Sequence, residues 1–400
     1  MTGSLNGIRV VDVTASVAGP FTTQILGDLG ADVVKVERPR TGDDTRSWGP
    51  PFWQEEAAAF LALNRNKRSL ALDLKTPEGK EALRRLIARA DIVVQNLRAG
   101  VFTDLGFGYD TLRELNPRLI FCDIGGYGPD GPMKDLPAYD PLMQAFSGLM
   151  SLTGEEGRPP VRIPASILDQ GTAMWTVVAA LDALRARDET GHGAHVQTSL
   201  LQTALMWLPI QLTGYLASGD LPRPLGSGTS TIVPYQAFPT RDGHLIVAAG
   251  NDNLWRRLCD AIERGDLADD PRFAGNPDRV RHRDELAAEL SATLESKPTG
   301  EWQKILDGAG VPSTAIQTLD QVVSHPQVRA TGALMPVPHP RIDDFTVVST
   351  PFQHDGAYPG VRHVPPLLGE HSQEVLGELG YEQSEIAALA DQGVITQHHR

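Results

Sequence analysis

Asp169 has the residue type and the position of a catalytic carboxylate. It stands directly before Gln170, where the longest helical pattern of the chain begins and continues to Arg187. By pattern alone, Asp169 is most simply an N-cap, because Asp is among the residues preferred at that position. The same position would also suit catalysis, since the N-terminus of a helix stabilises a carboxylate as the anion and keeps it available as a nucleophile at neutral pH. The pattern leaves both interpretations open.

Other sequence motifs that carry chemistry are weak or missing. Gly126–Gly131 has the letters of GxGxxG after a strand pattern, but Pro132 and Pro137 oppose the helix that a dinucleotide fingerprint should open. The sequence contains no P-loop, GxSxG or HExxH motif. His192 and His195 lie in a glycine-rich turn without a nearby acidic or thiol ligand, so we interpret them as structural and expect no metal.

Composition and charge restrict the class of protein. The chain has 400 residues, of which 41% are hydrophobic and 22% charged, which indicates a globular protein of two domains. Its formal net charge of −14 argues against a general binder of nucleic acid or of membrane surfaces. Cys122 and Cys259 form no CxxC pair, no segment approaches ~20 uninterrupted apolar residues, and the N-terminal residues lack a basic leader. We therefore expect a cytoplasmic protein.

Strand and helix patterns alternate in the first third of the chain. The strand patterns lie at 8–13, 33–36, 92–94 and 119–123, and helical patterns lie at 21–29 and 78–90. This alternation predicts a parallel α/β sheet of Rossmann-like type that is covered by helices. Open sheets of this type bind ligands at the carboxyl ends of their strands. The loops that should lie there are 14–20, 37–46, 95–106 and 124–140.

The rest of the chain indicates a second, smaller domain. An apolar helix is predicted over 200–217, followed by a Gly-, Pro- and Ser-rich linker over 219–234. Gln236–Ala249, with Asp242-Gly243 near its centre, predicts a hairpin. We expect the large Rossmann-like domain in residues 1–218, a small α+β domain with its flanking linker in 219–330, and a return linker with the C-terminal part of the large domain in 331–400.

Several motifs resemble those of the class III CoA-transferases, a family that includes formyl-CoA:oxalate, carnitine and arylacrylate-type CoA-transferases and α-methylacyl-CoA racemases. Leu63–Lys75 is similar to the family's N-x-N-K-R-S-x-x-L-D-x-K stretch. Other similar strings are Ala18–Pro20, Gly30–Pro39, Gly42-Asp43, Asn116–Leu119, Gly126–Gly128, Asp169, Ala179–Leu184, Thr190-Gly191, Ser199-Leu200 and Pro366–His371. The resemblance therefore covers nearly the whole chain.

The resemblance implies a reaction and the residues that perform it. The reaction moves coenzyme A from an acyl-CoA to a small carboxylic acid, in an interlocked homodimer whose chains thread through each other, with Asp169 as the nucleophile. The implied coenzyme A positions are Val17, Ala18, Arg38, Leu72, Asp73, Leu74, Lys75, Asn96, Leu97, Arg98, Tyr139 and Asp140. Arg38, Lys75 and Arg98 would supply cations for the phosphates of coenzyme A. No metal is implied.

Two positions depart from the family's pattern. Asp104 stands where many relatives have a basic residue, which puts a phosphate contact there in doubt. Tyr139 replaces the His of the racemases' G-H-D string, so proton exchange at an α-carbon lacks one of its two bases. The alternatives are a racemase-like enzyme of CoA esters, an NADP-type oxidoreductase that uses Arg38 for the 2′-phosphate, and a non-catalytic CoA-ester binding protein. No residue pattern specifies the donor and acceptor acids.

Overall fold

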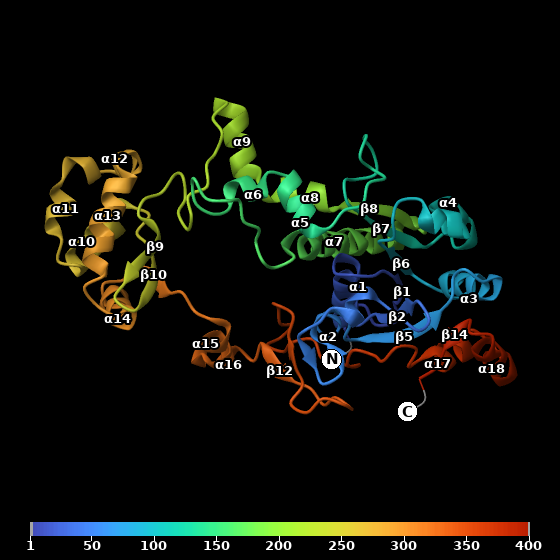
Figure 1. The fold of residues 1–400 in the computed structure, drawn as a ribbon. Helices are drawn as coiled ribbons and strands as arrows, with labels where there is room; N and C mark the ends of the chain where they lie inside the picture. The colour runs from blue at the N-terminus through green and yellow to red at the C-terminus, as the bar shows by residue number, and fades with distance from the viewer. Residues whose placement is uncertain (1–2, 399–400) are drawn as a thin grey trace. The chain divides into compact units, whose positions relative to one another are not determined.

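The structure is a computed structural model that describes residues 3–398 (Figure 1). The chain divides into two compact units. Unit 1 contains the residues up to Ser147, Pro164–Pro209 and the residues from Arg329 onward, and unit 2 contains Gly148–Ile163 and Ile210–Val328. Within the described residues, no helix is both long and apolar enough to cross a membrane.

A seven-stranded sheet forms the centre of the described part of unit 1, in the order β14-β5-β2-β1-β6-β7-β8. Its strands are β1 (Arg9–Val13), β2 (Asp32–Glu37), β5 (Lys67–Leu72), β6 (Ile92–Gln95), β7 (Ile120–Gly125), β8 (Ala194–Ser199) and β14 (Ile395–Thr396). All neighbours are parallel except β14, which pairs antiparallel with β5 at the edge of the sheet (Figure 1). The predicted parallel sheet is thus confirmed, with β5, β8 and β14 as strands that the sequence patterns did not indicate.

Helices cover both faces of this sheet, as expected for parallel strands that are buried on both sides. The helices of unit 1 include α1 (Ala18–Asp28), α3 (Pro77–Ala88), α4 (Tyr109–Leu115), α5 (Asp140–Phe146), α7 (Ile167–Thr190), α8 (Leu200–Trp207), α17 (Ser372–Glu378) and α18 (Gln383–Asp391). Alternate side chains of the strands, such as Val11, Val34 and Val93, pack in one core with α3, α4, α17 and α18. The C-terminal helices therefore belong to the sheet domain.

The apolar helix predicted over 200–217 is interrupted. The structure has α8 up to Trp207, a break at Leu208, and α9 (Pro209–Ser218) beyond it. Proline has no backbone N–H and its ring clashes with the preceding turn, so Pro209 starts a new helix instead of continuing the first. The prediction of one continuous helix is therefore wrong.

Unit 2 is built around a three-stranded antiparallel sheet of β9 (Tyr235–Thr240), β10 (Gly243–Ala248) and β11 (Ser313–Ala315). The turn of the β9–β10 hairpin contains Asp242, as predicted. Further helices of this unit include α10 (Asp252–Ala261), α13 (Arg283–Leu294) and α14 (Thr299–Gly308), whose apolar faces share a core with the hairpin.

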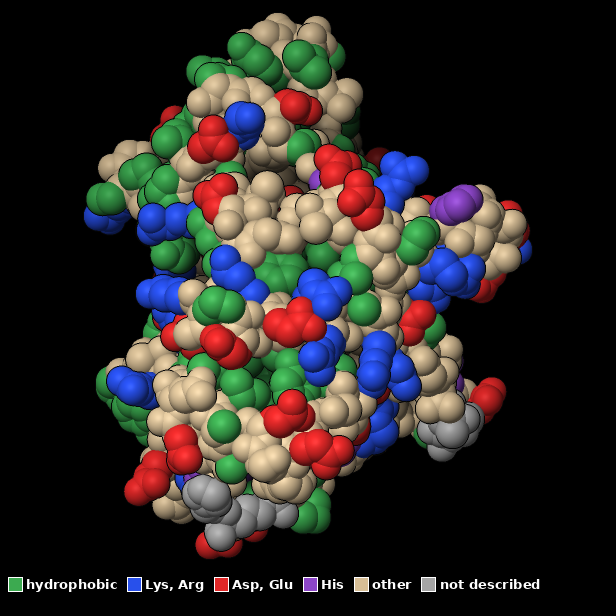
Figure 2. Space-filling model, turned by 90° about the vertical axis from the view of Figure 1, so that its right-hand side faces the viewer, with side chains coloured by type: hydrophobic (Ala, Val, Ile, Leu, Met, Phe, Trp, Pro, Cys, Tyr) green, Lys and Arg blue, Asp and Glu red, His purple; other side chains and the backbone are tan. Residues whose placement is uncertain are grey.

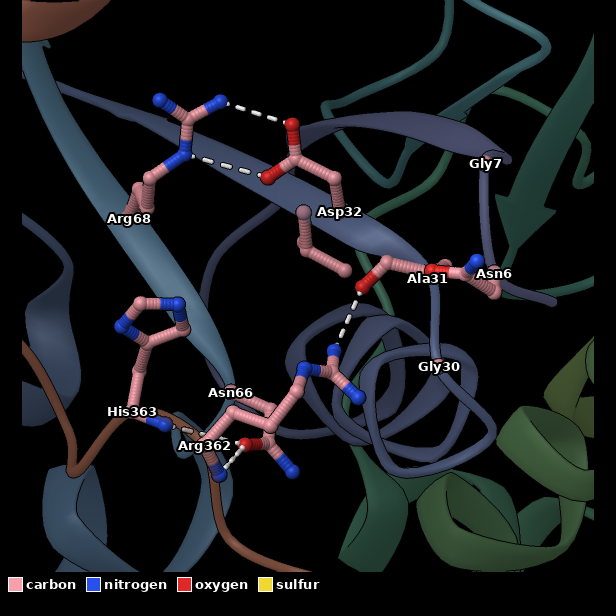
Figure 3. A pocket seen from close by; sticks show the side chains of 10 residues that line it. Asn6, Gly7, Gly30, Ala31, Asp32, Asn66, Arg68, Arg362 and His363 are labelled. Carbon is pink, nitrogen blue, oxygen red and sulfur yellow. Dashed lines mark hydrogen bonds and ion pairs between the residues drawn. The ribbon is translucent and has the colours of Figure 1, made fainter. Parts of the chain in front are cut away.

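The C-terminal part of the chain is anchored at the amino ends of β2 and β5 (Figure 3). Asn66 Oδ1 accepts hydrogen bonds from the backbone N–H groups of Arg362 (2.6 Å) and His363 (3.1 Å). Arg362 in turn donates to the carbonyl groups of Gly27 and Ala31. A cavity of about 170 Å³ lies among these residues. It is at the opposite edge of the sheet from the loops expected to bind ligand.

Five charged side chains are buried beneath those loops. Asp12 Oδ2 lies 3.1 Å from Lys67 Nζ and 3.9 Å from Lys35 Nζ, and Lys35 also pairs with Asp43 at 2.8 Å. Glu37 accepts from the backbone N–H of Asp43. Burial alone would raise the pKa of the Asp12 carboxyl, but the ammonium groups of Lys35 and Lys67 outweigh it and hold that pKa well below its usual range. Burial lowers the pKa of Lys67 to about 8.

Removing one charge of this network should destabilise unit 1 strongly. Lys67 Nζ also donates to Pro20 O and to Asn64 Oδ1, both at 2.8 Å, so Lys67→Met leaves three acceptors without their donor. We expect the free energy of unfolding to fall by about 3–5 kcal/mol, as when one partner of a buried ion pair is lost. Urea denaturation measures this. The exposed Lys304→Met is the control, with an expected change below about 0.5 kcal/mol. Equal stabilities of the two variants would contradict the prediction.

Candidate active site

Four loops line the carboxyl edge of the sheet side by side. The strands β5, β2, β1 and β6 are neighbours in that order and parallel to one another, so the loops that follow them meet at one edge. Most of the predicted coenzyme A residues lie on or next to these loops, namely Leu72, Asp73, Leu74 and Lys75 after β5, Arg38 after β2, Val17 and Ala18 after β1, and Asn96, Leu97 and Arg98 after β6. The topology thus brings these separate segments together.

The loop between β1 and α1 is held in place by buried polar groups. Asp12 Oδ1 accepts from the backbone N–H of Thr14 at 3.0 Å, and Lys35 Nζ donates to Thr14 O at 2.9 Å. The backbone N–H of Ser16, a residue with φ +68°, donates to Asp43 Oδ1 at 3.2 Å. No side chain caps the first turn of α1, and that turn has no acidic residue. Its backbone N–H groups therefore suit an anionic ligand.

The basic side chains near this edge fall into two groups. Lys35 and Lys67 are buried in the ion network, so these cations support the fold. In contrast, the side chains of the predicted phosphate ligands Arg38, Lys75 and Arg98 are exposed. Arg38 forms an ion pair with Asp44 and donates to Gly42 O. On the face in Figure 2, Lys and Arg side chains lie among Asp and Glu side chains.

Asp169 does not cap its helix. The helix α7 begins at Ile167, three residues earlier than predicted, with Ser166 at the N-cap and Asp169 in the first turn. The cap comes from Asp140, whose Oδ2 accepts from the backbone N–H groups of Leu168 (2.7 Å) and Asp169 (3.3 Å). The N-cap interpretation of Asp169 is therefore wrong. Local sequence could not reveal the true cap, because Asp140 lies on a different helix.

The topology places Asp169 at the same edge as the four loops. The helix α7 leads through a short turn ending in Gly193 into β8, which runs parallel to β7. A helix that precedes a parallel strand in this way runs antiparallel to the sheet, so its N-terminus lies at the carboxyl edge. The same argument places the first turn of α1 there, and α1 packs directly against α7.

The pKa of the Asp169 carboxyl also differs from the low value expected at a helix N-terminus. Burial of the side chain, together with the nearby Asp140 carboxylate, raises the pKa of Asp169 to about 7. The prediction that the helix N-terminus keeps the carboxylate fully anionic at neutral pH therefore does not hold. Asp140 itself is 2% exposed, and its Oδ1 accepts from Gln144 Nε2 at 2.5 Å. Near neutral pH, both the carboxylate and the carboxylic acid of Asp169 are populated.

The helix α8 packs closely against the first turns of α7. A Cβ atom at Gly171 would lie 2.5 Å from the ring of Trp207, so only glycine allows this approach. Thr172 Oγ1 donates to Thr203 Oγ1 at 2.8 Å and joins the same two helices. The remaining predicted site residue, Tyr139, directly precedes Asp140 and its side chain is exposed. The first turns of α7 thus pack against α8 and are capped by Asp140 of α5.

Comparisons with known proteins identify the family. The model of CoA-transferase family III matches residues 5–372. The succinyl-CoA:glutarate CoA-transferase of Mus musculus is 38% identical over 98% of this chain and 91% of the mouse protein. The acetyl-CoA:oxalate CoA-transferase of Acetobacter aceti is 37% identical over 83% of this chain and 86% of its own length. A crystal structure of a CaiB/BaiF family protein from Brucella suis, 37% identical, superposes with a TM-score of 0.86 over 95% of this chain and all of that one. The chain therefore belongs to CoA-transferase family III.

Proposed function

We propose that this enzyme transfers coenzyme A from an acyl-CoA to a free carboxylic acid through covalent intermediates on Asp169. The observation that carries the proposal is the position of Asp169. It is a half-buried carboxylate in the first turn of α7, at the edge where four loops of the parallel sheet meet. A carboxylate at such an edge has access to a ligand bound by the loops.

The reaction proceeds by successive acyl exchanges at Asp169. Its ionised carboxylate attacks the carbonyl carbon of the donor thioester, which forms a mixed anhydride and releases the coenzyme A thiolate. The thiolate then attacks the Asp169 carbonyl carbon of the anhydride, which releases the donor acid and leaves Asp169 as a thioester of coenzyme A. The acceptor carboxylate attacks this thioester, and the same two steps run in reverse. Covalent catalysis thus divides one difficult exchange into easier steps, and one thioester replaces another without ATP.

Coenzyme A would lie along the four loops. The uncapped first turn of α1 and the exposed side chains of Arg38, Lys75 and Arg98 provide positive charge for its phosphates. Backbone and apolar groups of Val17, Ala18 and Leu72–Leu74 would hold the adenine ring and the pantetheine arm. This arrangement gives local positive potential to a chain whose formal net charge is −14.

The substrates are proposed from the relatives. Their names contain succinyl-CoA or acetyl-CoA as the donor and glutarate or oxalate as the acceptor. Small dicarboxylic acids are therefore the first acceptors to test with this enzyme. A racemase reaction is less well supported, because Tyr139 stands where a racemase of the wider family has a His base, and a phenol is a poorer proton acceptor than an imidazole at neutral pH.

The nucleophile can be tested by substitution and trapping. Asp169→Ala should fold normally, since the helix is capped by Asp140, and should lose transfer from succinyl-CoA to glutarate by about 10³-fold or more. Asp188→Ala, an exposed carboxylate near the other end of α7, is the matched control with unchanged turnover. In the wild type, hydroxylamine should trap the activated carboxyl on the peptide with Asp169, as mass spectrometry detects. Full turnover by Asp169→Ala would refute the role, and deuterium exchange at the α-carbon without any trapped adduct would favour a racemase.

The pH dependence follows from the environment of Asp169. Only the ionised carboxylate attacks, and its pKa is about 7, so kcat/KM should fall as the pH decreases through that value. Asp140→Asn removes the neighbouring negative charge but keeps an oxygen that caps α7, so the midpoint should move to lower pH. It should stay above the ordinary value of about 3.9 for Asp, because the burial remains. A midpoint that stays the same or rises would show that Asp140 does not act on Asp169.

A homodimer is proposed for the assembly. Apolar side chains on the surface of α5, α7 and α8, three helices that pack against one another, support it, and five of them are at least half exposed, Leu142, Phe146, Met174, Val178 and Met206. A second copy of the chain would cover this surface, and its exposure in a lone chain is costly.

If the two chains are interlocked, the dimer should not dissociate on dilution. The wild type should remain dimeric at nanomolar concentration in mass photometry, because threaded chains separate only after partial unfolding. Val178→Asp should impair assembly, whereas Val178→Ala, which adds no charge, should assemble normally. A wild-type monomer that forms on dilution with native circular dichroism would contradict interlocking.

A further inference from the structure

Two polar side chains join neighbouring strands at the carboxyl edge of the sheet. Gln95 ends β6 and is 6% exposed, and Asp123 lies opposite it in the register of β7. Gln95 Nε2 donates to Asp123 Oδ1 at 2.5 Å, and Gln95 Oε1 accepts from the backbone N–H of Leu97 at 2.8 Å. The side chain of Gln95 therefore connects the neighbouring strand with the loop that follows its own strand.

Asp123 determines which way the Gln95 amide points. An ionised carboxylate only accepts hydrogen bonds, so the NH₂ group of Gln95 must face Asp123 and the carbonyl oxygen must face Leu97. Without Asp123, the amide has no such preference, and its flipped form would place a donor against the N–H of Leu97. A bond to a charged acceptor is also stronger than a neutral one. Asp123 thus fixes the conformation of the turn after β6.

Asn96, in the middle of this turn, holds the loop between β1 and α1. Its Oδ1 accepts from the backbone N–H of Ala15 at 2.9 Å, and its Nδ2 donates to the carbonyl oxygen of Ala15 at 2.8 Å. Both backbone groups of Ala15 are therefore bound by one side chain. Ala15 directly precedes Ser16, whose positive φ leads into the start of α1. The position of Val17 and Ala18 thus depends on the position of Asn96.

We propose that Asp123 and Gln95 are positioning residues for coenzyme A, which act through the Asn96 side chain on the loop Thr14–Ala18. The inference rests on the proposed placement of coenzyme A at this edge. Neither residue contacts the ligand in this arrangement. Their effect is to preorganise two adjacent loops, and preorganisation lowers the conformational entropy that binding must overcome.

His195 lies near Asp123 and provides a control substitution. Its ring stacks on Tyr109 with centroids 4.5 Å apart and lies 5.2 Å from Phe121. Its Nε2 is 3.9 Å from Asp123 Oδ2, beyond hydrogen-bond distance, and has no hydrogen-bond partner among the described residues. His195→Phe therefore preserves the stacked packing and leaves the bond between Asp123 and Gln95 intact.

The experiment measures the Kd of coenzyme A by calorimetry, and KM and kcat of transfer, on the full-length protein. Asp123→Ala should raise both Kd and the KM for acyl-CoA about 10-fold, with kcat at saturation changed less than about twofold. Asp123→Asn keeps an acceptor oxygen for Gln95, so it should restore binding to within about threefold of the wild type. His195→Phe should bind like the wild type.

A double-mutant cycle tests whether Asp123 acts through Asn96. Asn96→Ala removes the contact with Ala15, through which Asp123 is proposed to act. The Kd of the double variant Asn96→Ala/Asp123→Ala should therefore exceed that of Asn96→Ala by less than about twofold. The inference is overturned if Asp123→Ala binds coenzyme A as the wild type does, or if His195→Phe raises the Kd as much as Asp123→Ala. It is also overturned if the Kd of the double variant rises by the product of the two single fold-changes. Failure of the wild type to bind coenzyme A would instead refute the proposed function and, with it, this inference.

Discussion

The attraction between Asp12 and the ammonium groups of Lys35 and Lys67 joins three strands of the sheet domain. All three side chains are fully buried, and a buried charge without its partner is strongly destabilising. The charges lie on three adjacent strands, β1, β2 and β5, so their pairing is compatible with only one register of these strands. The network thus makes the alignment of the strands a condition for the stability of the fold.

The same network shapes the loops at the carboxyl edge. Asp12 and Lys35 bind both backbone polar groups of Thr14, and Asp43 binds the backbone of Ser16. Rigid positioning of loops by buried groups suits a large, flexible ligand such as coenzyme A, because little loop entropy is lost on binding. Buried cations support this geometry, while Arg38, Lys75 and Arg98 remain exposed where a phosphate could reach them.

Asp140 has two opposing effects on the proposed nucleophile. Its carboxylate caps α7 and thereby fixes the first turn in which Asp169 lies. The same charge, together with burial, raises the pKa of Asp169 towards neutrality. A higher pKa lowers the fraction of Asp169 that is ionised, but it also makes the ionised form a stronger nucleophile. Structure and reactivity at this position are therefore coupled through one neighbouring side chain.

The parallel α/β architecture, the β9–β10 hairpin and the family could be predicted from the amino-acid sequence. These follow from signals carried by adjacent residues, such as the Val-rich runs of β1 and β2, the turn at Asp242-Gly243 and the motif Leu63–Lys75. Three features of the site became visible only in the folded chain, namely that Asp140 caps the helix of Asp169, that the pKa of Asp169 is raised to about 7, and that Lys67 is a buried structural cation. The reason is physical: a hydrogen bond or a charge interaction depends on distance in space, and Asp140 is far from Leu168 along the chain. The burial that shifts a pKa exists only after distant segments have packed together.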